Sequence, residues 1–89
     1  MVRQQIVIKN KFGLHTRAAA RLVDIAKKFQ SKIELVCHDR NVDCKSIMSV
    51  ITLGAQQGAT FNLVVSGDDE SEATQAITQL IDDKFGEKE

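Results

Sequence analysis

The residues best suited to chemistry in this 89-residue chain are His15 and Arg17, in the stretch KFGLHTRAAARLV. Apolar residues follow them at helical spacing, so His15 falls at the expected start of a helix. Unpaired backbone N–H groups and the positive end of the helix dipole lie there, favouring a neutral imidazole and an anion attached to it. Arg17 adds a charged fork able to grip phosphate oxygens. The pair predicts an imidazole that takes up a phosphoryl group and hands it on.

The neighbouring residues are compatible with such a site but do not prove it. Gly13 permits a tight turn before the histidine, and the alanines at positions 18–20 keep bulk away from the opening. The local string has little specificity, because a histidine at this position also caps a helix or joins a core without further chemistry. That bland role is therefore the alternative.

Composition narrows the class of protein. The chain has 12 Lys and Arg against 12 Asp and Glu, and this zero formal net charge argues against a nucleic-acid-binding protein, which needs a basic surface. Its length predicts one domain over residues 1–89. Its first residues contain no long apolar run, so we expect neither a signal peptide nor membrane insertion, and a cytoplasmic location.

Two cysteines, Cys37 and Cys44, flank the stretch CHDRNVDC. With His38 they offer at most three ligands and lack the spacing of a structural zinc site, so no metal is expected. A disulfide requires a hairpin turn centred on residues 40–41, whereas a turn centred on residues 38–39 does not bring the two together. We expect free, half-buried thiols and a solvated His38 at the turn.

The periodicity of apolar residues predicts seven elements. Strands are expected over residues 4–10 and 59–67, with a hairpin over 32–44 between them. Helices are expected from Thr16 to about residues 30–31, from Ser46 to Gly54 or Gly58, and over 68–86, where Asp69 and Glu72 have the spacing of a capping box.

The resulting order, βαββαβα, predicts an α+β fold. We expect an open-faced β-sandwich, with a four-stranded, mainly antiparallel sheet and three helices on one face. Polar residues alternate with apolar ones over residues 59–67, which indicates that the other face of the sheet meets water.

The segments GLHTRAAA and KSIMSVITLG, at this separation and on this element order, resemble the HPr family of phosphocarriers of the bacterial phosphotransferase system. The resemblance covers essentially the whole chain. It implies that His15 accepts a phosphoryl group on its δ1 nitrogen from Enzyme I and passes it to enzyme II A-type domains in sugar uptake. Arg17 matches the arginine that steadies the phosphorylated ring. Such a protein is a carrier and not an enzyme, and no cofactor is implied.

The resemblance also implies a regulatory site and a docking surface. Ser46 matches the serine that HPr kinase/phosphorylase modifies in some bacteria, and a serine before an apolar helix is also a preferred N-cap. The family's partners dock on the first two helices, which here implies a surface made of Thr16, Ala20, Arg21, Ile47, Met48 and Ile51. We expect a monomer.

One residue departs from the family at the active site, since Ala18 stands where a proline is usual. The expected consequence is a less rigid helix start without loss of function. Two alternatives remain open: a nitrogen-related or regulatory HPr paralogue, and a small α+β regulatory binding domain without phosphotransfer.

Overall fold

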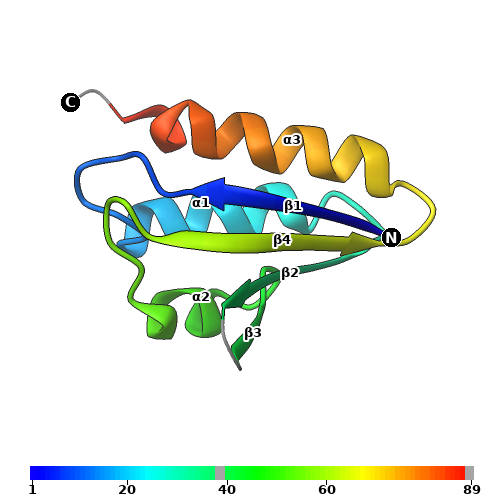
Figure 1. Cartoon of the computed structure of the whole chain (residues 1–89), viewed down its shortest axis with the longest axis horizontal. Helices are drawn as coiled ribbons and strands as arrows, with labels where there is room; N and C mark the ends of the chain where they lie inside the picture. Colours follow the sequence, from blue (N-terminus) through cyan, green and yellow to red (C-terminus); the bar gives the residue numbers. More distant parts are fainter. Residues whose placement is uncertain (38–39, 88–89) are drawn as a thin grey trace.

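The computed structural model describes residues 1–37 and 40–87 and has the predicted order of elements (Figure 1). A short 3-10 helix, η1, follows the last α-helix. The elements are β1 (Val2–Val7), α1 (Thr16–Ala26), β2 (Lys32–Cys37), β3 (Arg40–Asp43), α2 (Ile47–Leu53), β4 (Thr60–Ser66), α3 (Glu70–Asp82) and η1 (Lys84–Gly86).

The four strands form one sheet in the order β1-β4-β2-β3, and every neighbouring pair is antiparallel. In β4, Phe61, Leu63 and Val65 are buried, while Thr60 and Ser66 are exposed and Asn62 is half-buried. Figure 1 shows α1 and α3 running along the sheet and α2 beside β3, which it contacts. The α+β open-faced sandwich is therefore confirmed.

A single apolar core joins the sheet to the helices. Its members are completely or almost completely removed from solvent, which is the main source of stability in a domain of this size. They include Ile6, Ile8, Leu22, Val23, Ile33, Leu35, Val50, Leu63, Val65, Ile77, Ile81 and Phe85.

The first helix ends earlier than its periodicity predicts. The helix ends at Ala26, and the N–H of the C-cap residue Lys27 donates to the carbonyls of Val23 and Ile25. The expected end at residues 30–31 is therefore wrong by about one turn. The backbone N–H groups of Gln30 and Ser31 are taken instead by the carboxylate of Asp69, at 2.8 and 2.9 Å. A contact across the molecule thus replaces the last helical turn.

The same carboxylate overturns the predicted capping box. Asp69 precedes α3, but its side chain makes no capping hydrogen bond, because it also accepts from the hydroxyl of Ser31 at 2.5 Å. The hydroxyl of Ser31, with the N–H of Gln30, lowers the pKa of Asp69 below its usual value. At the start of α3, the side chain of Glu70 accepts from the N–H of Gly67, which precedes the helix.

The last helix is also shorter than predicted, since α3 ends at Asp82 rather than at Gly86. Beyond it, Lys84 and Phe85 both have a φ of 56° and Gly86 has a φ of 77°. Phe85 is fully buried. Figure 1 shows that α3 ends at the same end of the molecule as the loop between β1 and α1. After the left-handed turn, Glu87 contacts His15.

The two cysteines are free, as predicted, but only Cys37 is half-buried, whereas Cys44 is fully buried in the core. Cys37 pairs with Arg40 across the hairpin, whereas the N–H of Cys44 bonds to Ile33 at the other end of the hairpin. Burial raises the pKa of the Cys44 thiol to about 12. The predictions for the turn at residues 38–39 and for His38 lie outside the described residues.

Two further features bear on the class of protein. Within residues 1–37 and 40–87, no three His, Cys, Asp or Glu side chains are grouped so that they could hold a metal ion. No helix in this part of the chain has the length and apolarity needed to span a bilayer.

Candidate functional site

His15 lies at the N-cap of α1, where the sequence places it. Its backbone is extended, with φ −75° and ψ 178°, and its Nδ1 accepts a hydrogen bond from the N–H of Arg17 at 3.3 Å. A ring nitrogen that accepts in this way carries no proton, so these contacts put the ring proton on Nε2. About a third of the side chain is exposed (32%). The ring is thus accessible and has a lone pair at the helix start.

Gly13 fixes the loop that presents this histidine. It has a φ of 67°, and a Cβ at this position would lie 2.4 Å from the carbonyl oxygen of Ala55. The neighbouring N–H of Leu14 donates to the same carbonyl at 2.9 Å. The loop before α1 is therefore anchored to the segment after α2, and only glycine fits there without strain.

A carboxylate that the sequence did not indicate contacts the second ring nitrogen of His15. The Oε2 of Glu87 hydrogen-bonds to the Nε2 of His15. Its Oε1 accepts from the side-chain amide of Asn10 at 2.9 Å. Partial burial raises the pKa of Glu87, but the hydrogen bonds from Asn10 and His15 outweigh it, and the pKa lies below its usual value. Glu87 is therefore ionised at neutral pH.

An exposed aromatic ring completes the immediate surroundings. Phe12 is 68% exposed, and its ring meets that of His15 edge-on, with 6.0 Å between centroids. The sequence offered one signal for it, a large apolar residue in a glycine turn next to the histidine. Exposed aromatic rings are characteristic of docking surfaces.

The two arginines of α1 have different surroundings. Arg17 is exposed beside the ring, and its positive charge contributes to the lowered pKa of Glu87. Arg21, one turn further on, donates through its guanidinium to the carbonyl of Phe85. Arg17 is thus available to an anion on His15, whereas Arg21 holds the C-terminal turn.

Ser46 is the N-cap of α2, as predicted. Its hydroxyl oxygen accepts from the N–H of Ser49 at 3.4 Å and from the Ser49 hydroxyl at 3.0 Å. The helix ends at Gly54, which has a φ of 65°. The capping role expected from the sequence is therefore confirmed.

The residues predicted for docking lie on α1 and α2, which pack against each other. Thr16 is exposed and Ala20 is half-buried. Met48 and Ile47 are 68% and 38% exposed, whereas Ile51 is half-buried and packs against the core. The exposed apolar area beside α1 is therefore made mainly by Met48, Ile47 and the Phe12 that prediction missed.

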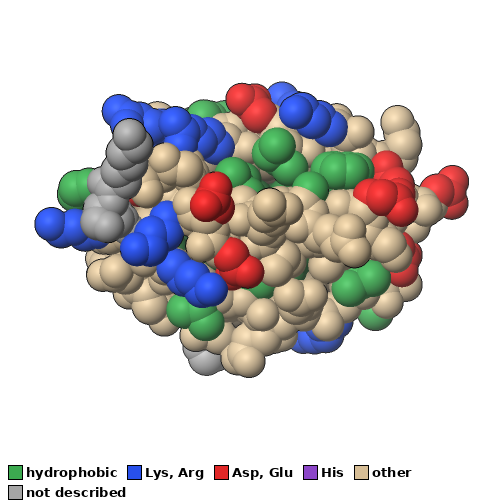
Figure 2. All heavy atoms as spheres, turned by 90° about the horizontal axis from the view of Figure 1, so that it is seen from above, with side chains coloured by type: hydrophobic (Ala, Val, Ile, Leu, Met, Phe, Trp, Pro, Cys, Tyr) green, Lys and Arg blue, Asp and Glu red, His purple; other side chains and the backbone are tan. Residues whose placement is uncertain are grey.

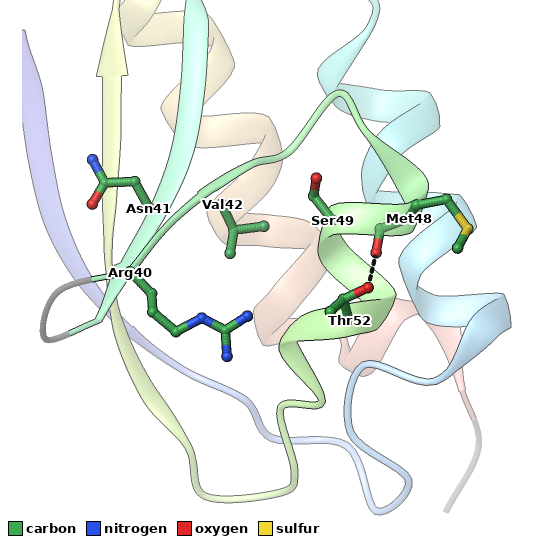
Figure 3. Close-up of a pocket in the computed structure, with 6 residues that line it drawn as sticks. All are labelled: Arg40, Asn41, Val42, Met48, Ser49 and Thr52. Atoms are coloured by element: carbon green, nitrogen blue, oxygen red, sulfur yellow. Dashed lines mark hydrogen bonds between the residues drawn. The ribbon is translucent and has the colours of Figure 1, made fainter.

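A hollow of about 380 Å³ lies on another side of α2, between that helix and β3. Figure 3 shows the guanidinium of Arg40 reaching from β3 toward α2, while the side chain of Met48 points away from Val42 and Arg40. His15 does not line this hollow, whose lining residues are Arg40, Asn41, Val42, Met48, Ser49 and Thr52. The predicted site is instead an open surface around the start of α1.

Comparison with known proteins identifies the family. Residues 2–83 match the family described as the PTS HPr component phosphorylation site. This chain belongs to the HPr family. It is 44% identical over 89 residues to the phosphocarrier protein HPr of Cupriavidus necator, with both chains covered completely. It is 46% identical to an HPr from Thermoanaerobacter tengcongensis, whose crystal structure superposes with a TM-score of 0.95 over 100% of both chains.

Membership of this family sets the broad function. HPr proteins are phosphocarriers of the phosphotransferase system and not catalytic enzymes. The matched residues contain His15, Arg17 and Ser46 but not Glu87. A second structure, titled an HPr dimer from the same Thermoanaerobacter species, matches with a TM-score of 0.75 at 45% identity, covering 98% of this chain and 100% of that one. A dimer is therefore known among similar chains, and the expected monomer stays a prediction.

The charges of this HPr are distributed unevenly despite their zero sum. In Figure 2, Lys and Arg side chains gather toward the end where the C-terminal residues lie, and Asp and Glu side chains toward the opposite end. The acidic end includes the first turn of α3, with Asp68, Asp69, Glu70 and Glu72. The two ends of the molecule therefore carry opposite charge.

Proposed function

We propose that this HPr accepts a phosphoryl group on Nδ1 of His15 from phosphorylated Enzyme I and passes it to an enzyme II A-type domain. The observation that carries the proposal is the hydrogen bond from the N–H of Arg17 to Nδ1, since a nitrogen that accepts it carries no proton and can use its lone pair to bind phosphorus once that weak contact opens. A phosphoryl group attached there meets unpaired N–H groups and the positive end of the α1 dipole.

In this proposal Arg17 binds the phosphoryl oxygens. Its guanidinium is exposed beside the ring and is always charged, and its planar fork matches the geometry of a phosphoryl group. The same charge faces the acidic donor and acceptor proteins that the proposal requires.

The proposed docking surface is centred on exposed apolar residues and has a basic rim. Ile47 and Met48 on α2 supply the apolar part, together with Phe12 in the loop before α1. The part contributed by α1 consists of Thr16, Ala20 and Arg21, while the half-buried Ile51 packs α2 against the core. Apolar centres of this kind provide most of the affinity, while charged rims increase the rate of encounter.

Ser46 is proposed as a site of regulatory phosphorylation by HPr kinase/phosphorylase. Its position as the cap of α2 supports this, because the dipole of a helix tolerates added negative charge at its N-terminus. A phosphate there lies beside Met48 and repels an acidic partner.

The experiment incubates the protein with phosphoenolpyruvate and Enzyme I. We expect one acid-labile, base-stable phosphate per chain in the wild type and none in His15→Ala, which should remain folded. Absence of phosphate from the wild type would leave a regulatory binding domain as the better description. Transfer onward to purified enzyme II A domains then separates the sugar branch from a nitrogen-related paralogue. A cytoplasmic location and a monomeric state belong to the same proposal.

A further inference from the structure

The site holds a carboxylate that neither the family motif nor the proposed function assigns. Glu87 contacts Nε2 of His15, 72 positions away in sequence, and lies beyond the residues that match the family. The contact closes a chain of hydrogen bonds across the ring. The N–H of Arg17 donates to Nδ1, the Nε2–H donates to Glu87, and the amide of Asn10 donates to the other oxygen of Glu87.

Asn10 is positioned to hydrogen-bond to this carboxylate. Its side chain is fully buried, and its amide nitrogen donates both to Glu87 and to the carbonyl of Gly13 at 2.6 Å. Its Oδ1 is buried without a hydrogen-bond partner in the described part of the chain. A buried unpaired acceptor destabilises the folded state, so the amide is oriented for the site at a cost in stability.

The backbone that leads to Glu87 is also strained. Three successive residues, Lys84 to Gly86, are left-handed, and two of these are not glycine. The full burial of Phe85 and the hydrogen bond from Arg21 to its carbonyl hold this turn in place. Strain that the surrounding structure maintains is a mark of functional sites. Directly after this turn, the side chain of Glu87 contacts His15.

We propose that Glu87 is a positioning residue for phosphoryl transfer, which holds the proton of His15 on Nε2 and thereby presents Nδ1 as the nucleophile. The proposal rests on the function proposed above. In the step, the N–H of Arg17 gives up its hydrogen bond to Nδ1, and the Nδ1 lone pair forms the N–P bond. The bond from phosphorus to the donor breaks at the same time, and its electron pair stays on the donor. The ring keeps its Nε2 proton and becomes positively charged. The carboxylate next to that proton offsets the charge, as the carboxylate of a catalytic triad does for its histidine.

The test compares Glu87→Gln, which keeps shape but removes charge, with Glu72→Gln, the same change at an exposed position on α3. Phosphorylation by phospho-Enzyme I is measured as the rate at saturation and the concentration that gives half of it. We expect Glu87→Gln to lower the saturated rate about tenfold, as loss of a charge-assisted hydrogen bond does, with the half-saturating concentration unchanged. Glu72→Gln should match the wild type, and Glu87→Asp should recover part of the rate.

A second readout separates positioning from a merely structural role. The ¹⁵N chemical shifts of the His15 ring report which nitrogen carries the proton, and we expect Nε2–H in the wild type and a mixture of tautomers in Glu87→Gln. Thermal unfolding checks that both variants are folded. An unchanged rate or an unchanged tautomer in Glu87→Gln overturns this proposal while leaving the carrier function intact. A wild type that takes up no phosphate removes both.

Discussion

At the scale of single residues, the proposed phosphoryl transfer depends on which nitrogen of His15 carries the proton. The sequence predicts that a helix starts after His15. That position explains why Nδ1 of its imidazole accepts a hydrogen bond from the backbone. Arg17 was predictable for the same reason, since it stands two positions away. Glu87 was not, because a contact between residues 72 positions apart leaves no spacing to recognise. Asn10 was missed too, because its polar side chain gave no sign of its burial.

The role of Arg17 is testable by keeping its charge and removing its fork. We expect Arg17→Lys to slow phosphorylation of His15 by about tenfold, because an ammonium group cannot make the two parallel hydrogen bonds of a guanidinium. The fold should be unaffected, since the side chain is exposed. The measurement is the initial rate with phospho-Enzyme I, and Arg40→Lys on β3 is the control. Equal rates for Arg17→Lys and wild type would remove Arg17 from phosphate binding.

At the scale of elements, type and order follow from periodicity, whereas the ends of helices follow from contacts across the molecule. The apolar spacing of α1 continues to Phe29, but the helix stops at Ala26. The next three N–H groups still bond back to carbonyls of α1, whereas those of Gln30 and Ser31 donate to Asp69, at the start of α3. Sequence gives local capping chemistry only, so it assigned Asp69 to its own helix. The left-handed turn at Lys84 and Phe85 was hidden likewise, because neither residue type favours that conformation.

The link between Asp69 and the α1–β2 loop predicts a dependence of stability on pH. Hydrogen bonds lower the pKa of Asp69, so they stabilise the fold above the usual value of 3.8, and this contribution is lost as the pH falls through the lower, folded value. Asp69→Asn should therefore lower the melting temperature at pH 7, and its difference from wild type should shrink below pH 3.8. Asp68→Asn, at the exposed neighbour, is the control. A difference that persists unchanged in acid would contradict the assignment.

The close approach at Gly13 predicts a loss of stability that exceeds the cost of its φ alone. Gly13→Ala should destabilise the fold by roughly 2 kcal/mol or more, because a Cβ meets the backbone of Ala55. Gly58 is a matched control, since it has a φ of 90° but no atom within 4 Å of its added Cβ. Urea unfolding measures both. Equal losses for Gly13→Ala and Gly58→Ala would mean that conformation alone matters.

At the scale of the whole molecule, a chain of zero net charge has a basic end and an acidic end (Figure 2). The zero net charge argues against a nucleic-acid-binding protein, but composition cannot report how the charges are arranged. Arg17 lies beside Glu87 and His15, and Arg21 donates to the carbonyl of Phe85 in the turn that precedes Glu87. The acidic α3 begins at the opposite end of the molecule (Figure 1). We therefore expect the acidic partner of the proposed function to be oriented before contact, with its acidic surface toward His15.

This arrangement predicts how a charge at Ser46 acts. Ser46→Asp adds a negative charge at the N-cap of α2. The helix dipole stabilises negative charge there, and the N–H of Ser49 can donate to it, so the fold should be as stable or slightly more stable. The same charge lies beside the proposed docking residues Ile47 and Met48 and repels an acidic partner. Phosphorylation of His15 by Enzyme I should therefore slow at low salt, and added salt should reduce the difference by screening.

The matched control for Ser46→Asp is Ser71→Asp, which puts the same charge in the first turn of α3 at the acidic end. Initial rates of His15 phosphorylation are measured for both variants and the wild type at low and high salt, alongside thermal unfolding. We expect slowing only in Ser46→Asp, because only that charge adjoins the docking surface. If both variants slow equally, net charge rather than position governs the encounter. If neither slows, Ser46 is a helix cap and lies outside the regulatory surface.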